Sequence, residues 1–84
     1  MRLNPGDTVR HFKGMRCKIL HIAKHSETLE EYIVYQHLDG AHEVWVRPLD
    51  MFLAPVDKAK YPDVIQEFRF EKISVEKILK SDLP

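Results

Sequence analysis

The stretch EYIVYQHLDGAHEVWVRP, residues 31–48, decides the fold. Its first half, residues 31–38, is rich in β-branched and aromatic residues, which suit the pleated surface of a strand. Asp39-Gly40 is a strong short-range signal for a hairpin turn, and residues 41–47 supply the returning strand. Pro48 lacks the N–H that a strand ladder needs, so the returning strand is expected to end there. The stretch therefore predicts an antiparallel hairpin.

Three further segments have strand character. Residues 8–12 follow a turn cluster that begins at Asn4, residues 15–25 form the longest β-like run, and residues 67–73 alternate apolar and charged side chains. Between the hairpin and the last strand, the sequence PLDMFLAP suits one tight helical turn. We expect three of its side chains to face inward: Leu49, Phe52 and Leu53.

These elements predict a mainly β protein, namely a small SH3-like antiparallel β-barrel of about five strands, with a helical turn before the last strand. Ser74 is a good N-cap for a short C-terminal helix at about 75–80. The 84 residues favour a single domain, 1–84. We place its barrel core at about 4–56, a connector at 57–66 and the closing strand at 67–73.

The charge balance bears on the class of partner. Thirteen basic residues match thirteen acidic ones, so the formal net charge is zero. A protein that binds nucleic acid through its phosphates usually shows a basic excess or a basic face, so this balance disfavours a non-specific nucleic-acid role. Zero net charge and exposed sheet edges favour self-association, and we expect a weak homodimer.

The single cysteine and the hydropathy pattern point to a cytoplasmic protein. Cys17 has no second cysteine with which to form an internal disulfide, and a small domain without disulfides fits a reducing compartment. The first residues lack the apolar run of a secretory signal, and no stretch approaches the ~18 apolar residues of a membrane span, so no membrane partner is expected.

Three blocks of sequence together resemble an uncharacterised bacterial family of small domains, a domain of unknown function. They are PGDTVRHFKG (5–14), AKHSETLEEYIVYQ (23–36) and VWVRPLDMF (44–52). The family pattern runs PGxxxRHFKG, HTET, a VVY strand and WVRPxxMF, and the similarity covers residues 4–56. Ser26 stands where the pattern has threonine, and Asp39 stands where an aromatic residue before glycine is common. The resemblance implies the fold and a bacterial cytoplasmic origin, and it implies no chemistry.

Metal binding and catalysis find little support. His37 and His42 are the best metal candidates, because a two-residue turn at Asp39-Gly40 makes them cross-strand partners, but two histidines alone are a weak site. Cys17 lies in a strand interior, where cysteine acts as a small hydrophobe. Adjacent residues on a turn, such as His25 and Ser26, seldom have the geometry of a nucleophile and its base. We expect no cofactor and no enzymatic activity.

Trp45 and Arg47 are the best binding candidates. They alternate with Val44 and Val46, which resemble core residues, and this places Trp45 and Arg47 on the outside or at the barrel rim. A two-residue turn places Trp45 opposite Val34, whereas a three-residue turn places it opposite Tyr35 and creates a Tyr35–Trp45–Arg47 strip. Trp45 is otherwise a plug at the barrel end, with Arg47 paired to a glutamate.

The sequence thus favours a non-catalytic interaction module that binds a protein or peptide segment. Aromatic residues and arginine are typical of interface hot spots. The expected contacts are Trp45, Arg47, Tyr35 and Arg10, with His25 added on the family resemblance alone. The alternative is a nucleic-acid-binding barrel that uses the same aromatic residues for stacking and presents Arg10, Lys13, Arg16 and Lys18 to the backbone. A metal-binding or enzymatic protein ranks third.

Overall fold

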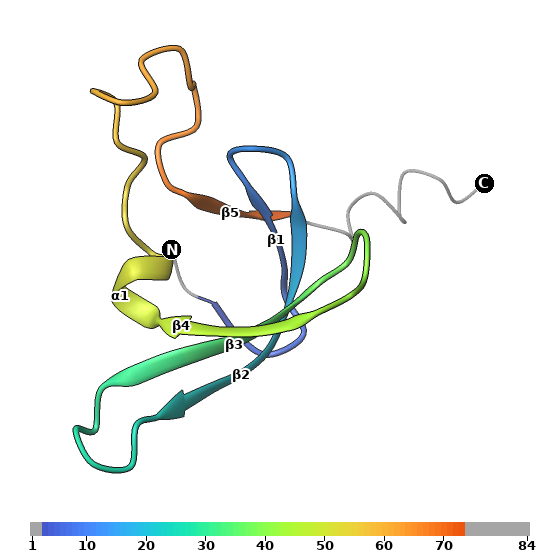
Figure 1. Cartoon of the computed structure of the whole chain (residues 1–84), viewed down its shortest axis with the longest axis vertical. Helices are drawn as coiled ribbons and strands as arrows, with labels where there is room; N and C mark the ends of the chain where they lie inside the picture. The colour runs from blue at the N-terminus through green and yellow to red at the C-terminus, as the bar shows by residue number, and fades with distance from the viewer. Residues whose placement is uncertain (1–2, 74–84) are drawn as a thin grey trace.

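The computed structural model describes residues 3–73, which contain five strands and one short helix (Figure 1). The predicted C-terminal helix at 75–80 lies outside the described residues, as does Ser74. Within residues 3–73, no helix is long and apolar enough to cross a membrane. The strands are β1 (Thr8–His11), β2 (Arg16–Lys24), β3 (Glu31–His37), β4 (Val44–Pro48) and β5 (Phe70–Ile73), and the helix is α1 (Leu49–Phe52).

The five strands form a single antiparallel sheet in the order β4-β3-β2-β1-β5. This confirms the prediction of a mainly β protein with five strands. β4 and β5 are the two edges of the sheet and are not hydrogen-bonded to each other, so the sheet is open where a barrel requires it to close. The SH3-like barrel therefore stays a prediction.

The hydrophobic core lies on one face of this sheet. Val9, Cys17, Ile19 and Ile33 are completely buried there, and they come from β1, β2 and β3. A bulge between Ile19 and His21 breaks the register of β2 against β3, and such an extra residue bends and twists a strand. The bend helps the long strand β2 to curve around the core.

Helix α1 completes the core from the side of β4. The ring of Phe52 stacks on the ring of Phe70 in β5, with centroids 3.9 Å apart and planes 6° from parallel. Leu49 and Leu53 are partly buried against the same cluster. The prediction that these three side chains of the helical turn face inward is confirmed.

The β3–β4 hairpin has the register in which Trp45 lies opposite Tyr35 and Arg47 opposite Ile33. Residues 38–43 connect the strands, and the N–H of His37 donates to the carbonyl of Glu43 at 2.9 Å. The two-residue turn is therefore wrong. The connection is longer, and β2 contacts it: Arg16 forms an ion pair of 3.0 Å with Asp39.

The connector at 57–66 is a compact loop whose two ends meet. The N–H of Val56 donates to Glu67 O at 2.8 Å, and the N–H of Arg69 donates to Ala54 O at 3.0 Å. Inside the loop, the Lys58 ammonium group donates to the carbonyls of Val64 and Gln66. Loops closed in this way hold their own shape on the surface and frequently carry function.

We expect Phe52→Ala to lower the free energy of unfolding by about 3–5 kcal/mol, because it empties a completely buried ring position in the core. Chemical denaturation monitored by circular dichroism measures this change. Met51→Ala is the matched control on the same helix, since Met51 is 51% exposed and surface changes usually stay within about 0.5 kcal/mol. Equal losses in the two variants would contradict the burial of Phe52.

Candidate functional site

Two neighbouring cavities open on the core-bearing face of the sheet. The first, which we call the aromatic cavity, has a volume of about 200 Å³. The second, the cationic cavity, has a volume of about 280 Å³. His11 of β1 and Arg47 of β4 line both cavities, so the two cavities lie side by side.

The aromatic cavity brings together three of the residues predicted from the sequence, Tyr35, Trp45 and Arg47. The hairpin register places Trp45 directly opposite Tyr35. The His37 ring stands beside both of them, with its centroid 6.1 Å from that of Tyr35 and 6.0 Å from that of Trp45. Tyr35 belongs to the core, whereas Trp45 is 48% exposed. Trp45 therefore offers half of its surface to a ligand.

The orientation of β4 differs from the prediction in one respect. Val44 and Val46, expected to be core residues, are 55% and 62% exposed. The register pairs Arg47 with buried Ile33 and Trp45 with buried Tyr35, so it is Trp45 and Arg47 that face the core side. Apolar character alone suggested the valines, but β4 is an edge strand whose face is set by its pairing with β3.

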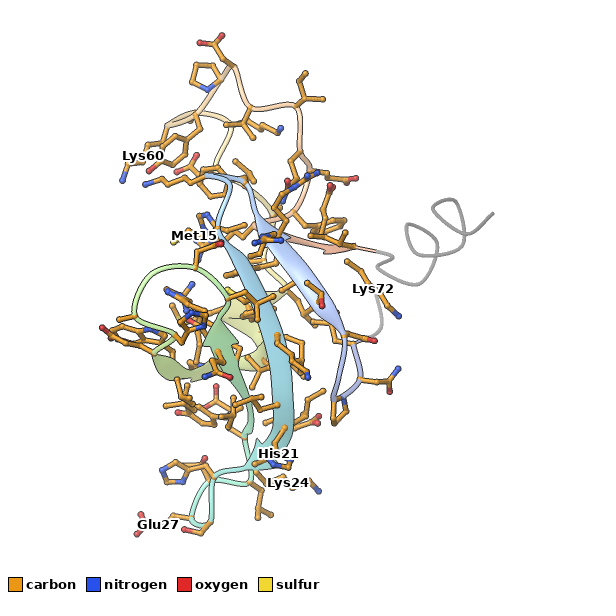
Figure 2. All side chains as sticks on the ribbon, turned by 90° about the vertical axis from the view of Figure 1, so that its right-hand side faces the viewer. Met15, His21, Lys24, Glu27, Lys60 and Lys72 are labelled. Atoms are coloured by element: carbon orange, nitrogen blue, oxygen red, sulfur yellow. The ribbon has the colours of Figure 1, made fainter. Side chains whose placement is uncertain are left out.

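Arg10 and His25, the other two expected contacts, line neither cavity. Arg10 is exposed on β1 between Val9 and His11, which place it on the opposite face of the sheet. His25 lies in the β2–β3 turn, where its Nδ1 accepts N–H bonds from Glu27 and Thr28. Figure 2 shows Glu27 at the end of the molecule remote from Lys60. Arg10 and His25 are thus separate from the strip formed by Tyr35, Trp45 and Arg47.

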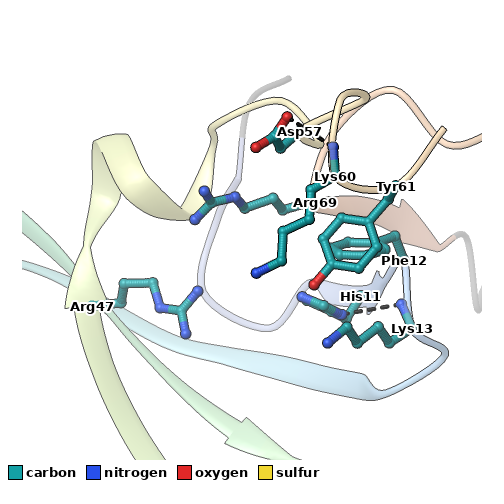
Figure 3. A pocket seen from close by; sticks show the side chains of 8 residues that line it. All are labelled: His11, Phe12, Lys13, Arg47, Asp57, Lys60, Tyr61 and Arg69. Atoms are coloured by element: carbon teal, nitrogen blue, oxygen red, sulfur yellow. Dashed lines mark hydrogen bonds between the residues drawn. The ribbon is translucent and has the colours of Figure 1, made fainter. Parts of the chain in front are cut away.

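The cationic cavity collects positive side chains from four parts of the chain (Figure 3). Arg47 comes from β4, Arg69 from the residue before β5, Lys60 from the connector and Lys13 from the β1–β2 turn. One carboxylate, Asp57, lines the same cavity, and its Oδ1 accepts the backbone N–H groups of Ala59 and Lys60. A chain with no net charge therefore has a local positive region.

Aromatic rings hold the two lysines in place. The ammonium group of Lys13 lies 5.4 Å from the centroid of the Tyr61 ring, and that of Lys60 lies 5.5 Å from the same ring. Tyr61 in turn packs edge-on against Phe12 at 5.0 Å. Gly14, with a φ of 103°, adopts the left-handed backbone that closes the turn after Phe12 and Lys13. The loop and the turn thus form one wall of the cavity.

None of the four cations of this cavity forms an ion pair within the part of the chain that the structure describes. The ion pairs there join Arg16 to Asp39 and Lys72 to Asp7. The alternative in which Arg47 pairs with a glutamate is not observed among residues 3–73. Arg47 and Arg69 are only half-exposed, so two guanidinium groups are partly desolvated without a carboxylate partner.

Lys60, Tyr61 and Arg69 were not predicted from the sequence, because the connector gave no sign of folding back toward β4. Lys13 was predicted to add positive charge, and it does line the cavity. The other three charges assigned to a nucleic-acid surface are exposed elsewhere: Arg10, Arg16 and Lys18 line neither cavity. Arg16 is engaged by Asp39, and this contact holds the pKa of the Asp39 carboxyl below its ordinary value.

His11 is the titratable group at the junction of the cavities. Its pKa is lowered, first because the ring is partly buried and then because Lys13, Arg47, Arg69 and His37 are close. Its Nδ1 accepts the backbone N–H of Lys13 at 3.1 Å, which assigns the hydrogen of the neutral ring to Nε2. Figure 3 shows the Nε2 side of the ring facing the cavity.

Cys17, His37 and His42 are the other groups considered for catalysis or metal binding. Cys17 is completely buried, and burial raises the pKa of its thiol, as expected for a small hydrophobe. The predicted cross-strand pairing of His37 with His42 is wrong, because the register places Glu43 opposite His37. Across residues 3–73, no three His, Cys, Asp or Glu side chains come together as a metal site requires.

Comparison with known families adds one finding. Residues 7–72 match the family model described as "Protein of unknown function (DUF1653)". The chain belongs to this family. The DUF1653 region extends from β1 to β5 and therefore contains both cavities and the connector. The predicted family resemblance is confirmed. No curated protein and no solved structure matches the chain.

We expect the His11 imidazole of this DUF1653 domain to titrate below its ordinary pKa of 6.5. The folded state disfavours protonation of His11, so the unfolded state binds the proton more readily. The free energy of unfolding therefore falls as the pH drops below about 6.5 and is fully retained above it. NMR titration of the ring measures the pKa, and urea denaturation at several pH values measures the stability.

Arg69→Gln should raise the His11 pKa, because it removes one of the positive charges beside the ring. Arg10→Gln makes the same change of charge on the opposite face of the sheet and serves as the control. A midpoint at or above 6.5 in the unmodified protein, or the same shift in both variants, would show that the cations of the cavity do not act on His11.

Proposed function

We propose that the protein is a non-catalytic interaction module, built on a small SH3-like β-fold, that binds an extended segment of a partner protein alongside β4. The observation that carries the proposal is the position of Trp45 and Arg47. Both lie on an edge strand, both line a cavity, and Trp45 is half-exposed. Partly exposed aromatic residues next to arginine are typical of the anchors of protein interfaces.

The backbone of β4 supports this mode of binding. In an antiparallel pair, the residues whose N–H and C=O groups bond to the neighbour alternate with residues whose groups point away. The bond from His37 to Glu43 sets this alternation, so Trp45 and Arg47 bond to β3. The N–H and C=O groups of Val44 and Val46 therefore point to the open edge of the sheet. A partner strand added there would satisfy them.

Charge complementarity indicates an acidic segment. A strand alongside β4 has the cationic cavity next to it, where four positive side chains face one carboxylate. A second copy of this chain is a less suitable partner, because it would bring a second such cavity into the same assembly. The proposed partner is therefore an extended, acidic segment of another protein, and not another molecule of this one.

The test begins with the selection of random peptides displayed on phage against the immobilised protein. We expect the selected peptides to be acidic and Trp45→Ala to weaken their binding by about tenfold or more, since buried aromatic anchors often contribute 2 kcal/mol or more. Fluorescence polarisation of labelled peptides measures the affinity. Met51→Ala, on an exposed side chain outside both cavities, is the control. Unchanged binding by a folded Trp45→Ala variant would refute the proposal.

Hydrogen exchange tests the edge directly, without a substitution that perturbs the fold. In the free protein we expect the amides of Val44 and Val46 to exchange rapidly, because their N–H groups point to the open edge. Bound peptide should protect them, while the already paired amide of His37 serves as the reference. Peptide binding that leaves both valine amides unprotected would exclude strand addition.

A second candidate function, single-stranded nucleic-acid binding, is favoured by the combination of the four cavity cations with half-exposed Trp45. It predicts that a thymidine oligonucleotide binds with a strong salt dependence. The slope of log K against log salt should be about −0.7 for each phosphate that is neutralised. Oligonucleotide binding that is absent or insensitive to salt leaves the protein-segment function as the better explanation of the surface.

A further inference from the structure

The cationic cavity carries an inference that goes beyond the binding of an extended segment. Its charges are supplied by four separate parts of the chain, and none of them has an ion-pair partner among residues 3–73. Bringing like charges together costs free energy, and after burial of the ring these charges are the second cause of the lowered pKa of His11. Two of these charges, Arg47 and Arg69, are also partly removed from solvent.

We infer that the cationic cavity is a binding site for a phosphate dianion, held by the guanidinium groups of Arg47 and Arg69 with Lys60 and Lys13 around them. Figure 3 shows the four side chains converging on the hollow from β4, the connector, the residue before β5 and the β1–β2 turn. The phosphate is either the free ion or the phosphoryl group of a phosphorylated side chain, since both present the same charge and oxygens.

The charge of the cavity favours a dianion over a single carboxylate. Four cations face only Asp57, whose side chain is occupied with the N–H groups of Ala59 and Lys60. A phosphate monoester carries close to two negative charges at neutral pH. The planar guanidinium forks of Arg47 and Arg69 match the spacing of phosphate oxygens, and lysine ammonium groups add charge with less directional demand.

His11 supplies a directed donor at the same place. Because its Nδ1 accepts the Lys13 N–H, its Nε2 carries the hydrogen, and this nitrogen faces the cavity. The charged groups that face the ring are Lys13 from the turn, Arg47 from β4, Arg69 from the segment before β5 and His37 from β3. A bound dianion would offset these positive charges, so phosphate binding and proton uptake by His11 should be coupled.

The experiment is a titration of the full chain with inorganic phosphate at constant ionic strength, followed by NMR of the His11 ring and the arginine side chains. We expect saturable shifts at His11 and Arg69 and a rise of the His11 pKa in the bound protein. Acetate and chloride at the same ionic strength should give no saturation. Equal responses to phosphate and acetate would overturn the inference.

Substitutions assign the site. Arg69→Gln should weaken phosphate binding by about tenfold or more, as the loss of a charge-assisted hydrogen bond predicts. Lys60→Gln, on the exposed loop, provides a second variant that does not depend on the half-buried Arg69. Arg10→Gln removes one charge from the opposite face and should have less than about a twofold effect. Equal weakening by Arg10→Gln would show that phosphate binding responds to the net charge of the protein, and it would overturn the proposed site.

The source of the phosphate follows from a second titration with phosphoserine blocked at both ends. Tighter binding of blocked phosphoserine than of inorganic phosphate would identify a phosphorylated side chain as the ligand. Equal affinity would identify the free ion. Blocked serine, the control, should not bind. Trp45→Ala keeps this inference apart from the proposed function, because it should weaken the binding of the selected peptides and leave the affinity for inorganic phosphate unchanged. If the unmodified protein binds the selected peptides but does not bind phosphate, this inference alone is overturned.

Discussion

The register of the β3–β4 hairpin is the constraint on which the rest of the functional face depends. Side chains alternate along a strand, so a slip of one residue would turn Trp45 and Arg47 to the other side of the sheet and bring Val44 and Val46 in. The observed register keeps Trp45 opposite Tyr35, and the connection at residues 38–43 is contacted by the start of β2. One of these contacts is the ion pair between Arg16 and Asp39, both of which are about half-exposed. Such a pair contributes little stability, so its main consequence is the position of the connection.

The core and the candidate site share one side of the sheet. A domain of this size buries only a small interior, and here Tyr35 and Phe70 serve both purposes, since each is buried and each lines the aromatic cavity. The stacked rings of Phe52 and Phe70 fix the position of α1 relative to β5, and thereby the distance between the β4 end and the β5 end of the open sheet. A preformed hollow lowers the ordering cost of binding.

The sequence predicted the elements better than the site, for a physical reason. Strand character, the effect of Pro48 and the inward side chains of the helical turn are local properties, and all of them appear in the structure. The prediction that Val44 and Val46 point into the core was wrong. It rested on the apolar character of valine, whereas the pairing of β4 with β3 decides which face of the sheet each side chain occupies. The sequence predicted that Tyr35, Trp45 and Arg47 form one strip in only one of two possible hairpin registers. Lys60 and Arg69 were not foreseen, since nothing local in residues 57–69 indicates that a loop closed by Val56 and Glu67 will return its charges to Arg47.

The distribution of charge gives the connector a role that its sequence does not suggest. Two cations elsewhere in the described chain, Arg16 and Lys72, have carboxylate partners within ion-pair distance. The connector does the reverse: it brings Lys60 to the hollow and engages Asp57 with its own backbone. Because Tyr61 contacts Phe12 and lies between two ammonium groups, the aromatic packing stabilises a cluster of cations that electrostatics alone would spread apart. An anion in the hollow, as we propose, would offset the repulsion among these cations.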